Sequence, residues 1–139
     1  MNQNYIFFPC LGLLVLTVVV LLRMVLTRVS AVKNGTVDVR FFKTYNLPGN
    51  LPNHMAQASR NFTNLFEVPT LFYMVCVFAL ITRNVDSLMY IAAWFYVGLR
   101  CLHSLIHLTS NKIVPRMSVY IASWLVLGFM GLLLAYKIL

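Results

Sequence analysis

The chain has 139 residues, of which 60% are hydrophobic and only 10% are charged, and its mean hydropathy is +0.80. Because soluble domains carry about 25% charged residues, this composition excludes an ordinary soluble protein and indicates an integral membrane protein. The net charge of +8 comes from 11 Lys and Arg against 3 acidic residues. We interpret this excess as the positive-inside bias of membrane proteins together with attraction to anionic headgroups, and we expect no nucleic-acid partner.

The first predicted helix covers about residues 5–32. Its apolar stretch from Tyr5 to Leu22 is close to the ~20 residues needed to cross the hydrocarbon core. The residues before it lack the basic patch of a signal peptide, and no small-residue cleavage site follows, so we expect a retained span. Arg23 and Arg28 are five residues apart and point in different directions. We expect Arg28 to turn toward neighbouring helices.

The only sizeable predicted loop covers about residues 34–53. Its glycines and prolines, among them the pair Pro48-Gly49, break regular secondary structure. Phe41, Phe42 and Tyr45 predict that the loop lies at the membrane interface. The loop is too short for a second domain, so we expect residues 1–139 to form a single domain.

Three more predicted helices follow, over about residues 55–82, 87–111 and 116–137. Pro69 lies near the middle of the first of these and is expected to kink it. Short turns separate the last three helices, so neighbours should be antiparallel. The predicted fold class is therefore an all-α membrane protein, a bundle of four transmembrane helices.

Four spans place both termini on the same side of the membrane. The first loop and the last turn carry most of the basic residues near helix ends, while the opposite side carries Arg83 and Lys137. The positive-inside rule then predicts that the first loop and last turn are cytoplasmic and that both termini are outside. We expect a multi-pass protein, most simply of a bacterial inner membrane.

Polar residues recur at helical spacing within two of the spans. Arg60, Asn64 and Glu67 stand at i, i+4 and i+7, and Arg100, His103 and His107 stand at i, i+3 and i+7. With antiparallel helices, these residues share one half of the membrane with Arg28 and Arg116. Such residues are costly within a membrane unless they face a partner, a cavity or a ligand.

Two interpretations of Glu67 and Arg100 stay open. They could form a buried ion pair that sets the register of two helices, or they could line a polar cavity that binds a charged ligand. His103 and His107 have a spacing that can hold a metal ion, but Glu67 is the only nearby carboxylate and the surrounding arginines repel cations. We therefore expect no metal site.

The cysteines give no sign of redox chemistry. Cys10, Cys76 and Cys101 lie far apart in apolar segments, without the spacing of a disulfide framework or a metal site. We expect buried, inert thiols.

The basic residues suit an anionic or zwitterionic ligand. Arginine presents a rigid fork to carboxylates, and a positive field stabilises a thiolate. A lone Glu67 with Asn64 would suit an amine on the same ligand. Glutathione carries two carboxylates, one amine and one thiol. The predicted binding set combines five basic residues with these two: Arg28, Arg60, Arg100, Lys112 and Arg116, with Asn64 and Glu67.

Two sets of residues resemble a known family. Arg60-x-x-x-Asn64-x-x-Glu67, followed by an apolar helix containing a proline, is similar to the second-helix signature of the MAPEG proteins, the membrane-associated proteins of eicosanoid and glutathione metabolism. Arg100-x-x-His103-x-x-x-His107 and Lys112-x-x-x-Arg116-x-x-x-Tyr120 resemble the third and fourth helices of the prostaglandin E synthase and glutathione transferase type. The resemblance extends over all four spans.

The resemblance implies a homotrimer of four-helix bundles with glutathione bound between adjacent subunits. It implies that Arg116 is catalytic and stabilises the thiolate, and that an apolar co-substrate enters from the lipid. The other implied glutathione contacts are Arg28, Arg60, Asn64, Glu67, His103 and Tyr120. At His107, Thr63 and Val39 the chain departs from the prostaglandin enzyme, which disfavours prostaglandin chemistry specifically.

The sequence therefore supports two functions of different classes. The first is a glutathione-dependent transferase or peroxidase acting on hydrophobic electrophiles, which the presence of Arg116 and Tyr120 favours. The second is a non-catalytic lipid-binding or scaffold protein of the same family, which the changes at His107 and Thr63 favour. A small transporter is disfavoured, because the chain shows no inverted repeat.

Overall fold

The computed structural model describes residues 1–44 and 52–139. A short 3₁₀ turn, η1 (Gln3–Ile6), leads into α1 (Phe7–Lys33), and a single helical turn, α2 (Phe41–Thr44), follows it. The remaining helices are α3 (Asn53–Ile81), α4 (Ser87–Leu108) and α5 (Ile113–Ile138). Four of these segments are long and apolar enough to cross a membrane. The predicted class, an all-α bundle of four membrane-type helices, is confirmed.

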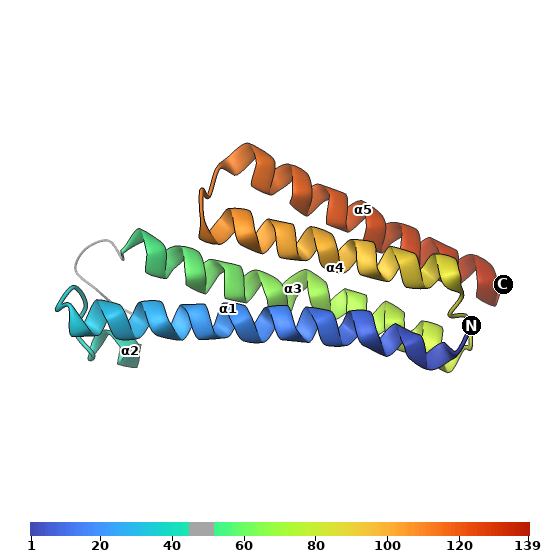
Figure 1. Cartoon of the computed structure of the whole chain (residues 1–139), viewed down its shortest axis with the longest axis horizontal. Coiled ribbons are helices and arrows are strands. Elements are labelled where there is room, and N and C mark those ends of the chain that lie inside the picture. Colours follow the sequence, from blue (N-terminus) through green and yellow to red (C-terminus); the bar gives the residue numbers. More distant parts are fainter. Residues whose placement is uncertain (45–51) are drawn as a thin grey trace.

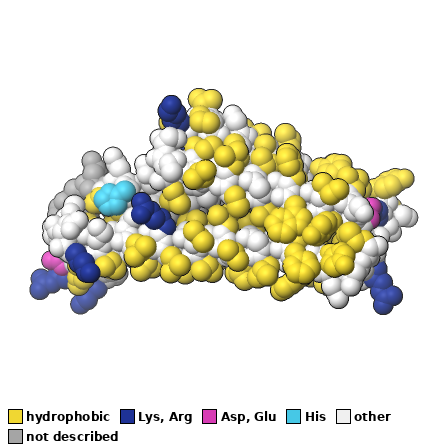
Figure 2. Space-filling view, in the orientation of Figure 1, with side chains coloured by type: hydrophobic (Ala, Val, Ile, Leu, Met, Phe, Trp, Pro, Cys, Tyr) yellow, Lys and Arg dark blue, Asp and Glu magenta, His cyan; other side chains and the backbone are white. Residues whose placement is uncertain are grey.

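The four long helices run side by side (Figure 1). Both termini and the α3–α4 turn lie at one end, and α2 and the α4–α5 turn lie at the other. The outward faces are strongly apolar: Val15 is 54% exposed, Phe95 61% and Leu125 70%. Hydrophobic side chains cover much of the surface in Figure 2, while Lys and Arg gather toward the ends. This distribution suits a protein whose middle is surrounded by lipid.

The core of the bundle is formed by large side chains from all four helices. Leu13 of α1, Phe72 of α3, Met89 and Tyr96 of α4 and Met130 of α5 are each fully buried. The rings of Phe72 and Tyr96 stack with their centroids 4.5 Å apart. This packing sets α3 against α4, one to two helical turns from the polar residues Glu67 and Arg100.

The region between α1 and α3 is partly regular. Phe41 begins the short helix α2 and is buried with Ala31, Val37 and Met55, so this part of the predicted loop packs onto the ends of α1 and α3. Tyr45, Pro48 and Gly49 lie outside the described residues.

The turn between α4 and α5 differs from the predicted one. α4 ends at Leu108, earlier than expected, and α5 already begins at Ile113, so Pro115 lies in its first turn and Arg116 directly after it. Proline fits there because the first N–H groups of a helix have no intrahelical partner to lose. In α3, by contrast, Pro69 lies inside a helix that continues past it.

The cysteines are all free thiols, but they are not all buried. Cys76 is buried and Cys10 half-buried, whereas Cys101 lies on the exposed side of α4. The expectation of burial was therefore wrong for Cys101, because α4 buries only the face that carries Arg100 and His103.

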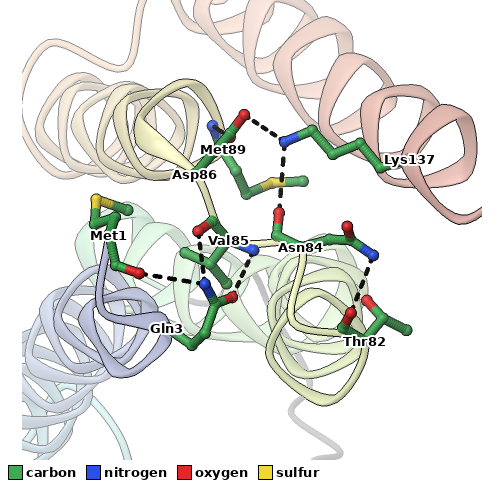
Figure 3. Close-up of polar contacts among 8 residues, drawn as sticks. All are labelled: Met1, Gln3, Thr82, Asn84, Val85, Asp86, Met89 and Lys137. Carbon is green, nitrogen blue, oxygen red and sulfur yellow. Dashed lines mark hydrogen bonds and ion pairs between the residues drawn. The ribbon is translucent and has the colours of Figure 1, made fainter.

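The α3–α4 turn is bonded by the first residues of the chain (Figure 3). The side-chain amide of Gln3 donates to the carbonyl of Val85 over 3.1 Å and accepts from the N–H of Val85 over 2.8 Å. This two-way bond ties the start of α1 to the turn.

The last turn of α5 is bonded to the same segment. The Lys137 ammonium forms an ion pair with Asp86 and donates to the carbonyl of Asn84 over 3.5 Å. Asp86 also caps α4, because its carboxylate accepts from the N–H of Met89 over 2.9 Å. The hydrogen bond from Lys137 and that from Met89 both hold the pKa of Asp86 below its usual value. All the helix ends at this end of the bundle thus meet at one short turn.

The pair gives a pH-dependent prediction. Since the pKa of Asp86 is lower in the folded protein, its contribution to stability is complete above the unfolded pKa of about 4 and is lost as the pH falls through the folded pKa. We expect Asp86→Asn, which can still cap α4, to lower the free energy of unfolding at pH 7 by about 1 kcal/mol or less. Thermal melts in detergent from pH 7 to pH 3 measure this effect. The difference between wild type and variant should shrink at low pH, and a constant difference would contradict the prediction.

Candidate functional site

A cavity of about 410 Å³ lies between α3, α4 and α5, toward the α4–α5 end of the bundle. It brings together most of the predicted site residues, which the sequence separates by up to sixty positions. Its lining residues are Ser59, Arg60, Thr63, Asn64 and Glu67 from α3, His103 and His107 from α4, and Arg116, Met117 and Tyr120 from α5.

The helical spacing explains how α3 contributes. Arg60, Asn64 and Glu67 lie along one side of this helix, and the amide nitrogen of Asn64 donates to the carbonyl of Arg60 over 3.0 Å. Arg60 and Glu67 are exposed and Asn64 is half-buried. α3 therefore supplies an open wall with a cation at one end and a carboxylate at the other.

The wall from α4 is buried. His103 and His107 are 4% and 3% exposed, and their rings lie 5.8 Å apart between centroids. Nδ1 of His103 lies 3.3 Å from the carbonyl oxygen of Arg116. Because a carbonyl only accepts, this contact requires the hydrogen to be on Nδ1, which leaves a lone pair on Nε2.

Two ring nitrogens at this wall lack hydrogen bonds. Nε2 of His103 and Nδ1 of His107 are buried and have no partner among the described residues. A buried polar atom without a partner costs about 1–3 kcal/mol. The two nitrogens are therefore an unrelieved cost in the described part of the chain, next to the cavity that both histidines line.

α5 contributes the central cation. Arg116 is half-buried and follows the first turn of α5, whose N-cap is Lys112 and whose first turn contains no acidic residue. Positive charge is unfavourable at the positive end of a helix dipole, so both residues make this helix end a favourable place for an anion. The N–H donor Nη1 of Arg116 contacts Oδ1 of Asn111 at 2.5 Å.

Arg100 lies beneath the cavity and does not line it. It is fully buried, its Nε donates to the hydroxyl of Tyr96 over 3.0 Å, and its guanidinium carbon lies 5.2 Å from the ring centroids of both Tyr96 and Tyr120. In residues 1–44 and 52–139 the one ion pair is that of Lys137 with Asp86, so Glu67 and Arg100 are not paired. The ion-pair interpretation of Glu67 and Arg100 was wrong. Glu67 is exposed and lines the cavity, whereas Arg100 is buried inside the bundle.

The single chain does not place Arg28 or Lys112 in the cavity. Arg28 donates to the hydroxyl of Ser59 over 3.4 Å and lies 5.6 Å from the ring of Phe42, beside a second cavity formed by α1 and the segment around α2. Lys112 is exposed at the start of α5. Arg28 nevertheless approaches the back of the α3 wall, because Ser59 also lines the site.

Sequence reasoning missed several residues around the site. Ser59 and Met117 line the cavity, and Ser104 donates to the buried Asn61 over 3.2 Å, which joins α4 to α3 below it. Asn111 was missed too, although an asparagine after a helical pattern is a known signal for a helix end. Ser59 and Ser104 carry no comparable signal.

The family can now be assigned. The model of the MAPEG family matches residues 6–136, which include the whole cavity and all four long helices except the last two residues of α5. This chain belongs to the MAPEG family. Neither a curated protein nor a solved structure matches it significantly. MAPEG membership and the four apolar helices establish an integral, multi-pass membrane protein and support a function related to glutathione.

His103 and His107 are the two residues whose spacing could hold a metal ion. Among the described residues, no group of three His, Cys, Asp or Glu side chains is placed to hold a metal ion. His103 and His107 instead share their cavity with Arg60 and Arg116, whose charges suit an anionic ligand.

Arg100 yields a prediction about stability. Its Nη1 and Nη2 are buried without hydrogen-bond partners among the described residues, and no carboxylate pairs with it there. Replacing a buried ion pair by apolar residues of similar volume is often neutral or stabilising, by about 1–4 kcal/mol, and a buried charge without a carboxylate has the same desolvation cost with less to offset it. We expect Arg100→Met to raise the melting temperature of the ligand-free protein, with Leu99→Met as the matched control. A lower melting temperature in Arg100→Met alone would show that the contacts with the two tyrosines outweigh the desolvation cost.

Proposed function

We propose that this protein is a membrane glutathione-dependent transferase or peroxidase that acts on hydrophobic electrophiles. The observation that carries the proposal is the composition of the cavity, which combines Arg60 and Arg116 with a single carboxylate, Glu67, and with two histidines of α4. Few common metabolites other than glutathione would use carboxylate-binding, amine-binding and thiolate-stabilising groups together. The volume of about 410 Å³ lies in the usual range for small-molecule sites.

Each group has a role that follows from its chemistry. Arg60 would bind a carboxylate of the tripeptide through its planar fork, and Glu67 would bind the amine, with Asn64 beside them. Arg116 would stabilise the thiolate, because a positioned cation in a partly water-excluded site lowers the free energy of a developing anion. His103, His107 and Tyr120 would complete the wall. The thiolate is then the nucleophile toward an electrophile that arrives from the lipid.

The exposed charges on α3 support an assembly. Arg60 and Glu67 are exposed on a membrane-length helix next to Phe66, which is 59% exposed. Charged groups facing lipid are unfavourable, whereas charged groups between subunits face one another and the ligand. We propose a homotrimer in which the open side of the cavity meets a second copy of the chain. Arg28 would then reach the glutathione site of an adjacent subunit, and Lys112 would lie at its entrance.

The basic residues support an orientation in the membrane. Lys33, Arg40, Lys43, Lys112 and Arg116 lie at the end of the bundle that also holds the cavity, and Arg83 and Lys137 lie at the other end. By the positive-inside rule we propose that the site faces the cytoplasm of a bacterium, with both termini outside the inner membrane.

A non-catalytic lipid-binding or scaffold protein is the alternative. Thr63 is a neutral residue in the cavity wall, and its hydroxyl is already bonded to the carbonyl of Ser59 over 3.2 Å. This wall therefore carries no cation at position 63, which favours weaker binding of a charged tripeptide.

The deciding experiment is a glutathione titration of the detergent-purified protein, followed by the ultraviolet absorbance of the thiolate. We expect a saturable thiolate signal in the wild type and its loss in Arg116→Ala, because the cation that stabilises the anion is gone. A folded wild type without this signal would leave the scaffold as the better account. Glu67→Gln serves as a second probe: an enzyme should lose glutathione affinity by about tenfold or more, whereas a scaffold should change only in stability.

Mixed assemblies test the shared site. If Arg28 serves the site of a neighbouring subunit, Arg28→Ala and Arg116→Ala chains should each be inactive alone. Coexpressed, they should regain about one quarter of the wild-type sites, since random mixing places both intact residues at one boundary in that fraction. The control is a chain that carries both substitutions, expressed alone. Its assemblies have no boundary with both residues intact, so they should stay inactive. No recovery would mean that Arg28 does not act across a subunit boundary.

A further inference from the structure

The segment between α4 and α5 lies outside the cavity lining but contacts one of its residues. Its conformation does not follow from helix periodicity. It comprises residues 109–112, and within it Asn111 has a φ of 48°, in the left-handed region. The N–H of Asn111 donates to the carbonyl of Ile106 over 2.8 Å, which ends α4. Asparagine and glycine adopt this conformation most readily among the amino acids. The backbone of Asn111 therefore closes the C-terminal end of α4, two residues beyond the C-cap Thr109.

The side chain of Asn111 has a separate contact. Its Oδ1 accepts a hydrogen bond from Nη1 of Arg116 at 2.5 Å. At the other end of the same residue, the carbonyl of Arg116 accepts from Nδ1 of His103. Arg116 is thus held at its side chain by the turn and at its backbone by α4, and its remaining N–H donors are left for the cavity that it lines.

The chemical nature of this contact matters. A carboxylate at position 111 would bind the guanidinium more strongly, but it would also neutralise much of its charge. An amide fixes the position and adds no net charge. The other charged or titratable groups facing the cavity are Arg60, Glu67, His103, His107 and Tyr120, with Arg100 below it. Of these, only Glu67 is acidic, and it lies on the opposite wall.

We propose that Asn111 is a positioning residue for the thiolate: it fixes the guanidinium of Arg116 at the cavity wall while leaving its positive charge undiminished. The proposal rests on the glutathione-dependent activity proposed above and adds a residue outside the cavity lining. Asn111 does not touch the ligand and acts through Arg116 alone.

The two roles of Asn111 can be separated by substitution. Asn111→Gly retains the left-handed backbone and the N–H bond to Ile106, and it removes only the side-chain acceptor. Asn111→Asp retains an acceptor and adds a negative charge. Ser110→Ala, at an exposed position in the same turn, is the matched control.

The first measurement needs no bound ligand. The detergent-purified protein is treated with phenylglyoxal, which modifies arginine, and the rate at each arginine is read by peptide mass spectrometry. We expect Arg116 to react several-fold faster in Asn111→Gly than in wild type, with Ser110→Ala and Asn111→Asp close to wild type. Arg60, which lines the same cavity, is the internal reference. Equal rates at Arg116 in wild type and Asn111→Gly would overturn the proposed contact.

The second measurement follows the thiolate of bound glutathione as a function of pH. We expect the midpoint of its absorbance to rise by about one pH unit in Asn111→Gly, because the stabilising cation is no longer held in place. In Asn111→Asp the midpoint should also rise, although Arg116 stays protected from phenylglyoxal, since the carboxylate offsets its charge. Melting temperatures close to wild type would exclude a merely structural effect.

The failures of the two proposals are distinguishable. A thiolate signal in wild type with the same midpoint in Asn111→Gly would overturn the positioning role and leave the glutathione function intact. The absence of a thiolate signal in folded wild type would overturn the glutathione function, and the thiolate role of Asn111 with it.

Discussion

The structure depends on one constraint: a bundle surrounded by hydrocarbon must satisfy its own polar and charged groups. At the end where the chain termini meet, the described side chains achieve this around the α3–α4 turn: Gln3 bonds to the backbone of Val85, and Lys137 pairs with Asp86. At the other end it is not. Arg100, His103 and His107 keep buried nitrogens without partners in the part of the chain described. These unsatisfied groups lie beside the cavity in which we propose that glutathione binds.

The arrangement around Arg116 follows from the same constraint. This residue follows the first turn of α5, where a cation is electrostatically unfavourable, and it is held by two neutral groups, the amide of Asn111 and the imidazole of His103. Neutral partners fix its geometry without consuming its charge. The unfavourable field is then relieved by an anion, which links the stability of the α4–α5 turn to the proposed binding of a thiolate.

Several features followed from the sequence because they depend on local periodicity. The four spans follow from the lengths of their apolar segments, and the shared face of Arg60, Asn64 and Glu67 follows from the pitch of a helix. The start of α5 at Ile113 did not, because proline is both a helix breaker and a favoured first-turn residue. Only the backbone geometry of the preceding turn distinguishes the two uses.

The sequence by itself determined that this is a four-helix membrane protein of the MAPEG type, with basic and amide residues concentrated in one half of the bundle. Hydrophobicity and helical spacing carry the four spans and the polar faces residue by residue, whereas the family came from the resemblance of two motifs, the one around Arg60 to Glu67 and the one from Arg100 to Tyr120. Only the tertiary structure decided which of those residues meet. It separated Glu67 from Arg100, placed Arg28 behind the α3 wall, and joined Asn111 to Arg116. These outcomes depend on how each helix is rotated about its axis when the core around Phe72 and Tyr96 packs, and rotation is set by contacts between helices and not by the pattern within any one of them.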